Sequence, residues 1–541
     1  MRFDRALALD RLAAEDFDVV IVGGGITGAG CALDAASRGL RTALVERGDF
    51  AIGTSSRSSK LVHGGIRYLE QKEFGLVREA LAERQIALRN APHLVHVLPF
   101  LIPVLTRDGL IDRRIARLLG GVLWMYDLSG GLRIKKAHRR MSREDALARV
   151  PTLRPEALAS AYLYYDAQAD DARLTLAITR TAVEHGAVAV NHAPAVAMLK
   201  GPSGRVTGVQ IEADGRIIDV RAPVVVNAGG VWADDVRALD EGGHPASLRP
   251  AKGVHITVPW DKVRNEIAMV VPVAGDRRSV FVVPWGTHTY IGTTDTDYEG
   301  SLDDPRCTPD DIAYLLRAVN RALVEPLTEH DVVGTWAGLR PLLRTGEDER
   351  TADLSRRHGI RVSHAGVVTI TGGKLTTYRA MAEDTIDQVD QLLDGRHRRC
   401  HTKRLSLIGA AGYQEPPDGG SPTAAHLARR YGTEASAVQG LIARDAALGE
   451  PLVPGLPYVK AEAVFAVRSE MARTLDDVLD RRTRARLLDR DATWAAAEAV
   501  ARLLAPELGW DDDEMARAVD AYRTDLDAER AASEPLGAGC P

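Results

Sequence analysis

Cysteine and aromatic residues are scarce in this sequence, and neither sign of charge prevails. Four cysteines occur in 541 residues, and aromatic residues make up 5%. The cysteines are too widely spaced for a zinc site and too few for a disulfide scaffold, so we expect free thiols and no bound metal. Lys and Arg total 69 against 74 Asp and Glu, a formal charge of −5. Since this charge does not draw the whole molecule to nucleic acid, we expect no nucleic-acid partner and only local anion sites.

Long hydrophobic segments are also missing. The longest apolar run, residues 94–105, is interrupted by His96, Pro99 and Pro103. It is shorter than the roughly 20 residues that a membrane-spanning helix needs. Residues 1–16 mix arginine with acidic residues and contain no apolar core of a secretory signal. We therefore expect a cytoplasmic protein without a transmembrane helix.

The length and the residue pattern predict several domains. Single hydrophobic cores stop growing at roughly 250 to 300 residues. The 45% hydrophobic and 26% charged residues are typical of a soluble globular protein. Strand-like runs alternate with helical stretches as far as Lys403, which predicts an α/β or α+β body. After a linker rich in Gly and Pro at 409–421, capped helical segments continue to the end, the first from Ser421 to Gly432.

The first element is a β-α-β unit with a glycine-rich turn. Residues 18–22 are a β-branched run typical of a buried parallel strand, residues 26–37 are helical, and residues 41–46 predict a second strand. In this order the glycines permit a tight turn and let a pyrophosphate approach the helix N-terminus, as in a dinucleotide fingerprint. The turn is Gly23-Gly24-Gly25-Ile26-Thr27-Gly28.

Two further features concern which dinucleotide would bind. Glu46 ends the second strand at about the 20-residue distance expected of an acid that accepts hydrogen bonds from the adenosine ribose. Fingerprint and acid together do not choose between NAD and FAD. A second glycine pair, Gly372-Gly373, ends a strand much later in the chain. It favours FAD, because so long a cofactor must be held by several segments.

Residues 54–70 are dense in hydroxyls and glycines and contain His63, Arg67 and Tyr68. Hydroxyl and backbone N–H groups suit a flavin pyrophosphate, and arginine suits a phosphate group. This segment closely resembles the signature of FAD-dependent glycerol-3-phosphate dehydrogenases, the respiratory branch of a larger glycine-oxidase and amino-acid-oxidase superfamily. Further segments similar to this family are 252–257, 291–297, 336–341, 371–379 and 467–484.

The resemblance implies an α/β fold class, with a Rossmann-like FAD-binding domain, an α+β substrate domain and an all-helical C-terminal cap domain. The implied limits are 16–75, 160–245 and 345–395 for the discontinuous FAD-binding domain, 76–159 and 246–344 for the substrate domain, and 405–530 for the cap domain. The implied FAD ligands are Gly23, Gly24, Gly25, Ile26, Thr27, Gly28, Glu46, Thr54, Ser55, Ser56, Ser59, His63, Gly229, Gly373, Leu375 and Thr376.

The resemblance also implies a reaction, the oxidation of sn-glycerol 3-phosphate to dihydroxyacetone phosphate. Hydride would pass to flavin N5, and the electrons would pass on to a membrane quinone. A substrate with a charge near minus two requires cations, above all arginine, whose planar guanidinium binds two oxygens at once. The implied substrate ligands are Arg67, Tyr68, Arg340, Arg356 and Lys374.

A group must also accept the hydroxyl proton, and histidine titrates closest to neutral pH. His255 and His63 are the candidates, although His63 could instead brace the loop that holds the flavin. We favour His255 as the general base, with Arg340 stabilising the developing alkoxide. Lys374 completes the predicted catalytic set. A cationic pocket could also lower the pKa of the alcohol enough to make a distinct base less necessary.

Other functions remain open at this point. The runner-up is a glycerol-3-phosphate oxidase that uses O2 and releases H2O2, since it would share the cofactor and the substrate site. An amine or amino-acid oxidase would need a pocket for a carboxylate, whereas the several cations favour phosphate. A non-catalytic dinucleotide-binding or scaffold protein would have no need of Lys374, Arg340 and His255.

Residues 111–126 bear on a membrane partner. Apolar residues recur at helical spacing, arginines occupy another face, and Trp124 and Tyr126 follow. This pattern suits a helix that lies in a membrane surface, and it would place the protein peripherally on the inner face of the cytoplasmic membrane. A core-packed amphipathic helix explains the same pattern, and the sequence alone slightly favours it. The oligomeric state stays open, with a homodimer among the options.

Overall fold

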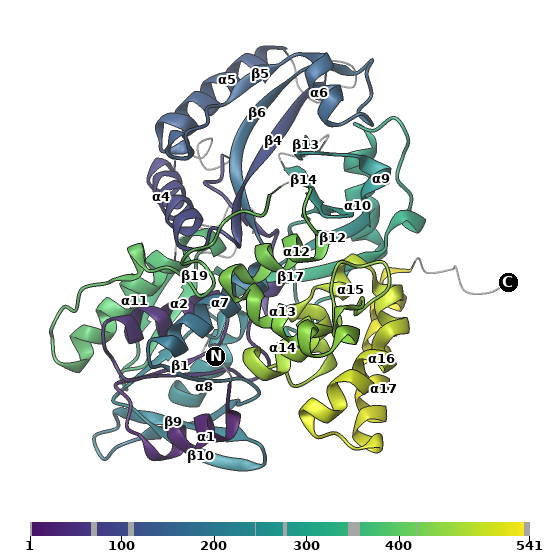
Figure 1. Ribbon diagram of the computed structural model, residues 1–541. Helices are drawn as coiled ribbons and strands as arrows, with labels where there is room; N and C mark the ends of the chain where they lie inside the picture. Colours follow the sequence, from purple (N-terminus) through teal and green to yellow (C-terminus); the bar gives the residue numbers. More distant parts are fainter. Residues whose placement is uncertain are drawn as a thin grey trace.

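The computed structural model describes residues 3–66, 73–105, 113–243, 245–273, 278–344, 358–417 and 419–534. These residues form a lower sheet domain, an upper domain with a larger sheet, and a group of C-terminal helices at one side (Figure 1). The expected α/β class with an all-helical C-terminal domain is confirmed. Within the described residues, every helix is too short or too polar to cross a bilayer.

The lower domain contains a six-stranded, mostly parallel sheet around β1. All residues of β1 are buried, as expected of a strand covered on both faces. β1 pairs in parallel with β2 on one side and with β11 on the other, and only β18 runs antiparallel to its neighbour. In sheet order the strands are β18 (His358–Val362), β19 (Val368–Gly372), β11 (Val224–Asn227), β1 (Val19–Val22), β2 (Thr42–Val45) and β7 (Val188–Val190).

Helices and a small sheet cover the two faces of this parallel sheet. On one face lie α2 (Ile26–Ser37), α7 (Asp171–Glu184) and α11 (Tyr378–Leu393), which pack on one another and share an apolar core with β1. The other face carries a second apolar core. Its elements are α1 (Arg5–Ala14) and a three-stranded sheet of β8 (Ala195–Lys200), β9 (Val206–Ala213) and β10 (Arg216–Arg221), with α8 (Ala233–Glu241) beside β8.

The upper domain is built on a ten-stranded mixed sheet. Its strands are β3 (Leu61–Val62), β4 (Val95–Leu105), β5 (Arg139–Met141), β6 (Leu158–Ala169), β12 (Leu248–Pro259), β13 (Ala268–Pro272), β14 (Ser279–Trp285), β15 (His288–Gly292), β16 (Thr296–Asp297) and β17 (Gly334–Leu343). Its helices are α4 (Phe74–Asn90), α5 (Arg113–Leu128), α6 (Arg143–Arg149), α9 (Trp260–Val263) and α10 (Pro309–Asn320). The domain limits given above remain predictions. β3 and most of β6 belong to this sheet although they fall inside segments expected for the FAD-binding domain.

Strand register in this sheet places the residues of the site. β12 pairs antiparallel with β17, which puts His255 opposite Trp336 and Ala251 opposite Arg340. On its other edge β12 pairs with β15, and His255 lies opposite Gly292. The central part of β12 is therefore flanked by two strands from the segments that resemble the dehydrogenase family.

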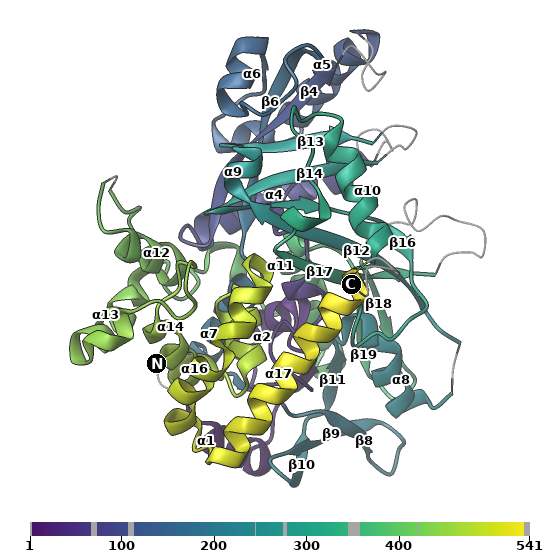
Figure 2. The same ribbon diagram turned by 90° about the vertical axis from the view of Figure 1, so that its right-hand side faces the viewer.

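The C-terminal domain is helical, and its last two helices, α16 and α17, pack side by side and face the viewer in Figure 2. The helix expected after Ser421 is confirmed, since the Ser421 side chain accepts a hydrogen bond from the Ala424 amide and the helix ends before Gly432. Residues 477–482 form a π-helical turn, which directs Arg481 and Arg482 toward Asp49. The helices are α12 (Pro422–Tyr431), α13 (Ala435–Arg444), α14 (Lys460–Glu470), α15 (Ala485–Leu488), α16 (Arg490–Leu508) and α17 (Asp512–Ser533).

Candidate active site

The glycine turn has no room for side chains. A β-carbon at Gly28 would collide with the Gly23 carbonyl, and one at Gly23 would collide with the Ala228 carbonyl. Gly23 also has a φ of +113°, which L side chains rarely adopt. Gly25, the N-cap of α2, has no side chain that would fill the space in front of the turn, so the positive end of the helix is open to this space.

This turn opens onto a cleft of about 360 Å³, here named the cofactor cleft. The turn is braced from the side by Ser55, whose hydroxyl accepts a hydrogen bond from the Ile26 amide at 2.8 Å. A narrow glycine cradle at a helix N-terminus fits a dinucleotide pyrophosphate. The predicted cofactor residues that line the cleft are Gly23, Gly25, Ile26, Thr27, Glu46, Thr54, Ser55, Gly229, Gly373 and Leu375.

Glu46 has hydrogen-bond partners within the protein itself, independent of any ligand. Its carboxylate accepts hydrogen bonds from the Gly24 amide at 2.6 Å and the Gly48 amide at 2.9 Å. Burial raises the pKa of this carboxyl, and the two amide bonds oppose the rise. Glu46 therefore fixes the glycine turn, and it also faces the cleft where a ribose would lie.

A second space of about 170 Å³, here named the inner cavity, adjoins the cofactor cleft. Both are lined by Thr54, Ser58, Pro341, Gly372, Gly373, Lys374 and Leu375. The inner cavity is also lined by Ser59, His63, His255, Arg340 and Thr376. Segments that are far apart in the sequence therefore meet where the cleft ends, as the proposed chemistry requires.

His255 is a buried, neutral imidazole in this cavity. Its Nε2 lies 2.9 Å from the Ser59 hydroxyl, and its ring stacks on Trp336 with centroids 4.8 Å apart and planes 8° from parallel. Nδ1 has no hydrogen-bond partner among the described residues. Burial, followed by the charges of Lys60 and Arg340, holds the pKa of His255 well below its ordinary value. The imidazole is therefore unprotonated at neutral pH, and without a bound anion it is a weaker base than a free histidine.

Arg340 and Lys374 bring positive charge to the same cavity. Arg340 Nη1 lies 3.1 Å from an Asp295 carboxylate oxygen, and Nη2 donates to the Thr293 hydroxyl at 3.1 Å. These bonds fix the guanidinium while its side chain remains 19% exposed. Lys374 lines both the inner cavity and the cofactor cleft, so its side chain faces the junction of the two spaces.

His63 and Thr376 close the cavity from the loop side. The His63 amide donates to the Thr376 hydroxyl at 3.0 Å, which supports a bracing role for this loop. Three expected site residues, Arg67, Tyr68 and Arg356, lie outside the described residues.

Three other expected cofactor residues line neither the cleft nor the inner cavity. Gly24 and Gly28 pack behind the turn. The Ser56 carbonyl accepts hydrogen bonds from Lys60 and Arg484 on the side of the helical C-terminal domain.

Two glycines were not singled out from the sequence: Gly253, which lines the inner cavity, and Gly292, which lies against His255. A β-carbon at Gly253 would collide with the Arg340 guanidinium, and one at Gly292 would collide with the His255 ring. Both glycines lie inside strands, where glycine is unfavourable unless another group approaches closely. That signal, inside two segments already assigned to the family, could have identified them.

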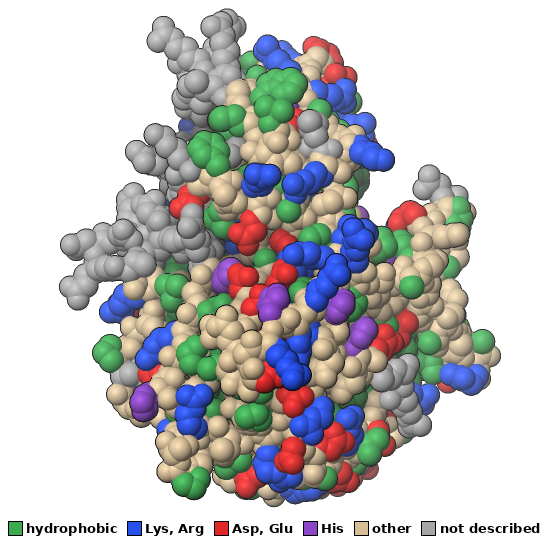
Figure 3. Space-filling view, turned by 90° about the vertical axis from the view of Figure 1, so that its left-hand side faces the viewer, with side chains coloured by type: hydrophobic (Ala, Val, Ile, Leu, Met, Phe, Trp, Pro, Cys, Tyr) green, Lys and Arg blue, Asp and Glu red, His purple; other side chains and the backbone are tan. Residues whose placement is uncertain are grey.

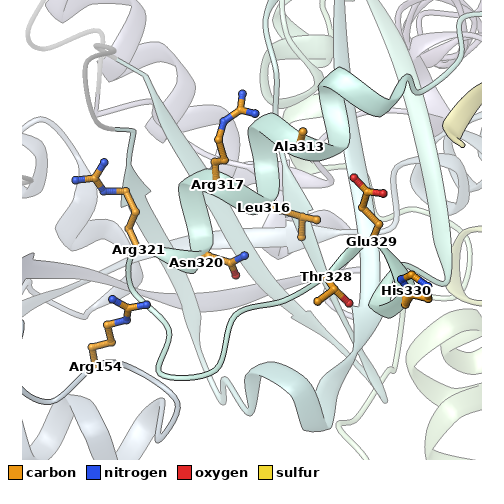
Figure 4. A pocket seen from close by; sticks show the side chains of 9 residues that line it. All are labelled: Arg154, Ala313, Leu316, Arg317, Asn320, Arg321, Thr328, Glu329 and His330. Carbon is orange, nitrogen blue, oxygen red and sulfur yellow. The ribbon is translucent and has the colours of Figure 1, made fainter. Parts of the chain in front are cut away.

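A larger and more open hollow of about 830 Å³ lies elsewhere, between α10 and the turn at Glu329–Asp331 (Figure 4). Arg154, Arg317 and Arg321 line one side of it, and Glu329 and His330 line the other. Asn320 binds the Leu327 backbone through both its amide and its carbonyl groups, which shapes the loop. None of the residues of the family segments lines this hollow, so size alone does not identify the site.

Comparisons with known proteins agree with the cleft and cavity. The family described as FAD dependent oxidoreductase matches residues 18–383, and the C-terminal domain of alpha-glycerophosphate oxidase matches residues 400–515. Glycerol-3-phosphate dehydrogenase 2 of Mycobacterium tuberculosis (strain ATCC 25618 / H37Rv) is 43% identical over an alignment of 538 positions, and the alignment covers 97% of this chain and 90% of that protein. The chain belongs to the FAD-dependent glycerol-3-phosphate dehydrogenase family.

Other members and neighbours of this dehydrogenase family extend the comparison. The mitochondrial glycerol-3-phosphate dehydrogenase of Homo sapiens is 37% identical over an alignment of 526 positions, and the alignment covers 92% of this chain and 71% of that protein. The structure of the Bacillus halodurans glycerol-3-phosphate dehydrogenase complexed with FAD has a TM-score of 0.79 at 32% identity, covering 98% of this chain and 99% of that one. This chain, which contains the glycine turn, is accordingly an FAD-dependent oxidoreductase.

Proposed function

We propose that the protein oxidises sn-glycerol 3-phosphate to dihydroxyacetone phosphate. The observation that carries this proposal is the junction of a glycine-walled cofactor cleft with a cavity that holds a neutral histidine and two cations, His255, Arg340 and Lys374. FAD, when bound in the cleft, supplies a hydride acceptor at N5. The relatives named glycerol-3-phosphate dehydrogenase support the choice of substrate.

In this proposal the chain's own residues bind the anion and move one proton. Arg340 and Lys374 attract the phosphate or the developing alkoxide, and Arg67, Tyr68 and Arg356 are the further ligands that the family resemblance implies. His255 takes the hydroxyl proton on its imidazole. A dianionic substrate would offset the positive charge around His255 and raise its pKa, so the base would strengthen when the substrate is bound.

Anaerobic mixing with glycerol 3-phosphate tests the reaction directly. The oxidised flavin absorbance of the holoprotein should be lost, and dihydroxyacetone phosphate should appear in equal amount. Glycerol, which lacks the phosphate, is the matched control and should leave the absorbance nearly unchanged over the same time. An unchanged spectrum with glycerol 3-phosphate would exclude this function.

A membrane quinone is the proposed electron acceptor, and α5 is the proposed contact with the bilayer. Leu123 and Tyr126 of this helix are buried in the core, whereas Trp124, Met125 and Leu128 are 57%, 42% and 73% exposed. Exposed basic residues follow over 133–140. α5 lies at the top of the molecule in Figure 1, and Figure 3 shows hydrophobic side chains with basic ones beside them at this upper end. Basic and apolar groups together favour an anionic membrane surface, here the inner face of the cytoplasmic membrane.

Vesicle sedimentation tests this attachment. Binding should be stronger to vesicles with anionic lipid than to neutral ones, and Trp124→Ser should weaken it, while Trp494→Ser in the helical C-terminal domain should not. Equal recovery in the supernatant with both vesicle types would contradict it. Comparing oxygen uptake with reduction of a soluble quinone analogue separates the dehydrogenase from the oxidase alternative, which the dehydrogenase relatives do not favour.

A further inference from the structure

Lys60 is a fully buried lysine just outside the inner cavity. Its side chain has no exposed surface, and its φ of +56° lies in the left-handed region that favours glycine or asparagine. Such a conformation is unfavourable for a lysine and persists only where the surroundings hold it. A buried charge on an unfavourable backbone conformation indicates that this side chain has a specific role.

Lys60 connects the helical C-terminal domain to the site through one carboxylate. Its ammonium donates to Asp171 at 3.0 Å, and Arg484 of the C-terminal domain donates to the same oxygen at 2.9 Å. The second oxygen of Asp171 binds the amide and the hydroxyl of Ser58 at 2.9 and 2.7 Å. Asp171 therefore anchors the backbone on which Ser59 and Lys60 lie.

The same segment holds the catalytic histidine candidate. The Lys60 ammonium lies 4.8 Å from the centre of the Trp336 ring, on which His255 stacks. The Trp336 indole N–H donates to the Ser58 carbonyl at 3.2 Å, and the Ser59 hydroxyl bonds His255 Nε2. Trp336 thus contacts both the ammonium and the imidazole, and adjacent residues of one short segment support each of them.

We propose that Lys60 is a positioning residue of the reaction, whose buried ammonium holds the Ser59, Trp336 and His255 arrangement and places a positive charge near the imidazole. This inference rests on the proposed function, in which His255 is the general base. Arg484 and Asp171 complete the arrangement from the C-terminal domain and from α7.

The charges around His255 support this role for Lys60. Lys60 and Arg340 are the cations that lower the pKa of His255, and Asp295 partly balances Arg340. His63 and Lys374 line the same cavity, and the Tyr290 ring lies 6.2 Å away with its hydroxyl bonded to the Ser59 carbonyl. Burial and the neighbouring Arg484 lower the pKa of Lys60 itself to about 8, against the attraction of Asp171, so Lys60 is mainly a cation at pH 7.

The test is the pH dependence of anaerobic flavin reduction by glycerol 3-phosphate in the holoprotein. The rate should fall on the acid side as His255 becomes protonated. Lys60→Met removes the charge at similar volume, so the pKa of His255 should rise and the acid limb should move up by about one pH unit. Lys60→Gln, which keeps a donor for the Ser56 carbonyl, should give the same shift. Lys403→Met, which removes an exposed ammonium paired with Glu383, is the matched control and should leave the limb in place.

Each outcome decides between the two proposals. Both Lys60 variants could reduce flavin more slowly at every pH while the acid limb of the pH profile stays in place. This result would mean that Lys60 is purely structural, and it would overturn the inference. Loss of flavin from both variants would overturn it as well, because a positioning residue leaves the cofactor bound. The His255→Asn variant distinguishes failure of the inference about Lys60 from failure of the proposed function. If the limb persists in that variant, His255 is not the base and the proposed function itself requires correction.

Discussion

The cofactor cleft and the contact surface of the helical C-terminal domain are built in opposite ways. The cleft is made of backbone: a glycine turn, a helix N-terminus, and two side chains, Glu46 and Ser55, that bind backbone amides. The contact surface is made of buried side-chain charges from residues distant in sequence. Asp49 accepts hydrogen bonds from Arg481 at 2.6 Å and from Arg482 at 2.5 Å. Further pairs are Arg173 with Glu470, Arg180 with Glu434, and Arg484 with Asp171.

This difference determines how each region responds to change. A site built from backbone needs few particular side chains, and its glycines are the positions that cannot be replaced. A buried ion pair adds little net stability, because desolvation offsets the attraction, but loss of one partner leaves the other charge unpaired. The C-terminal domain should therefore be far more sensitive to single charge removals than the cleft is.

Removal of the Asp49 carboxylate should have the largest effect. Among the described residues, Asp49→Ala leaves the buried Arg482 guanidinium with the Glu470 carbonyl as its one hydrogen-bond acceptor, so the free energy of unfolding should fall by about 3–5 kcal/mol. Chemical denaturation monitored by circular dichroism measures it. Glu498→Ala, at an exposed pair with Arg502, is the control and should change the value by less than about 0.5 kcal/mol. Similar decreases in the free energy of unfolding for both variants would contradict the expected difference between buried and exposed ion pairs.

Truncation of Arg340 should separate chemistry from cofactor binding. Because the cleft is held by backbone, Arg340→Ala should keep its flavin, while kcat/KM for glycerol 3-phosphate should fall by about 10²–10³-fold. Steady-state kinetics with a dye acceptor and the ratio of flavin to protein absorbance give the two values. Arg317→Ala, in the separate hollow beside α10, is the matched loss of one arginine and should leave both values unchanged. Near-normal turnover in Arg340→Ala would remove Arg340 from the mechanism.

His93 should make the linker to the C-terminal domain sensitive to acid. Its ring lies 5.7 Å from that of Tyr413, and burial lowers the pKa of His93 from 6.5 to about 4. The folded state therefore binds this proton less readily than the unfolded chain. The contribution of His93 to the free energy of unfolding is complete above pH 6.5. As the pH falls toward 4, the free energy of unfolding should decrease by about 2–3 kcal/mol.

The free energy of unfolding measured between pH 7 and 4.5 checks this loss. His93→Gln should show a shallower decline than the unaltered protein. The exposed His185→Gln should decline as steeply as the unaltered protein, and parallel curves for all three would contradict the assignment.

The smallest effect is expected in the cleft, at its one buried carboxylate. Glu46→Gln keeps one acceptor oxygen but loses the charge, so one of the two amide bonds should be lost and FAD binding should weaken about 10-fold. Fluorescence titration of the apoprotein with FAD measures the change. Glu498→Gln on the surface serves as the control. A loss of 1000-fold or more would mean that the cleft depends on side chains as much as the C-terminal contact surface does.

The same contrast explains what could be predicted from the sequence. The β-α-β unit, the glycine turn and the helix after Ser421 follow from local spacing, because backbone geometry and capping depend on neighbouring residues. The π-helical turn at 477–482 could not be predicted, since it depends on Asp49, which lies far away in the chain. The register that brings His255 onto Trp336 is likewise a product of tertiary pairing. Lys60 was visible within a family segment, but its contacts with Asp171 and Trp336 were not.

Gly253 and Gly292 limit how this enzyme could be redesigned. Any larger residue at either position would displace Arg340 or His255, so these strands offer no freedom for reshaping the pocket toward bulkier alcohols. Variation would have to begin at lining residues outside β12 and β15, for example at Leu342 of β17.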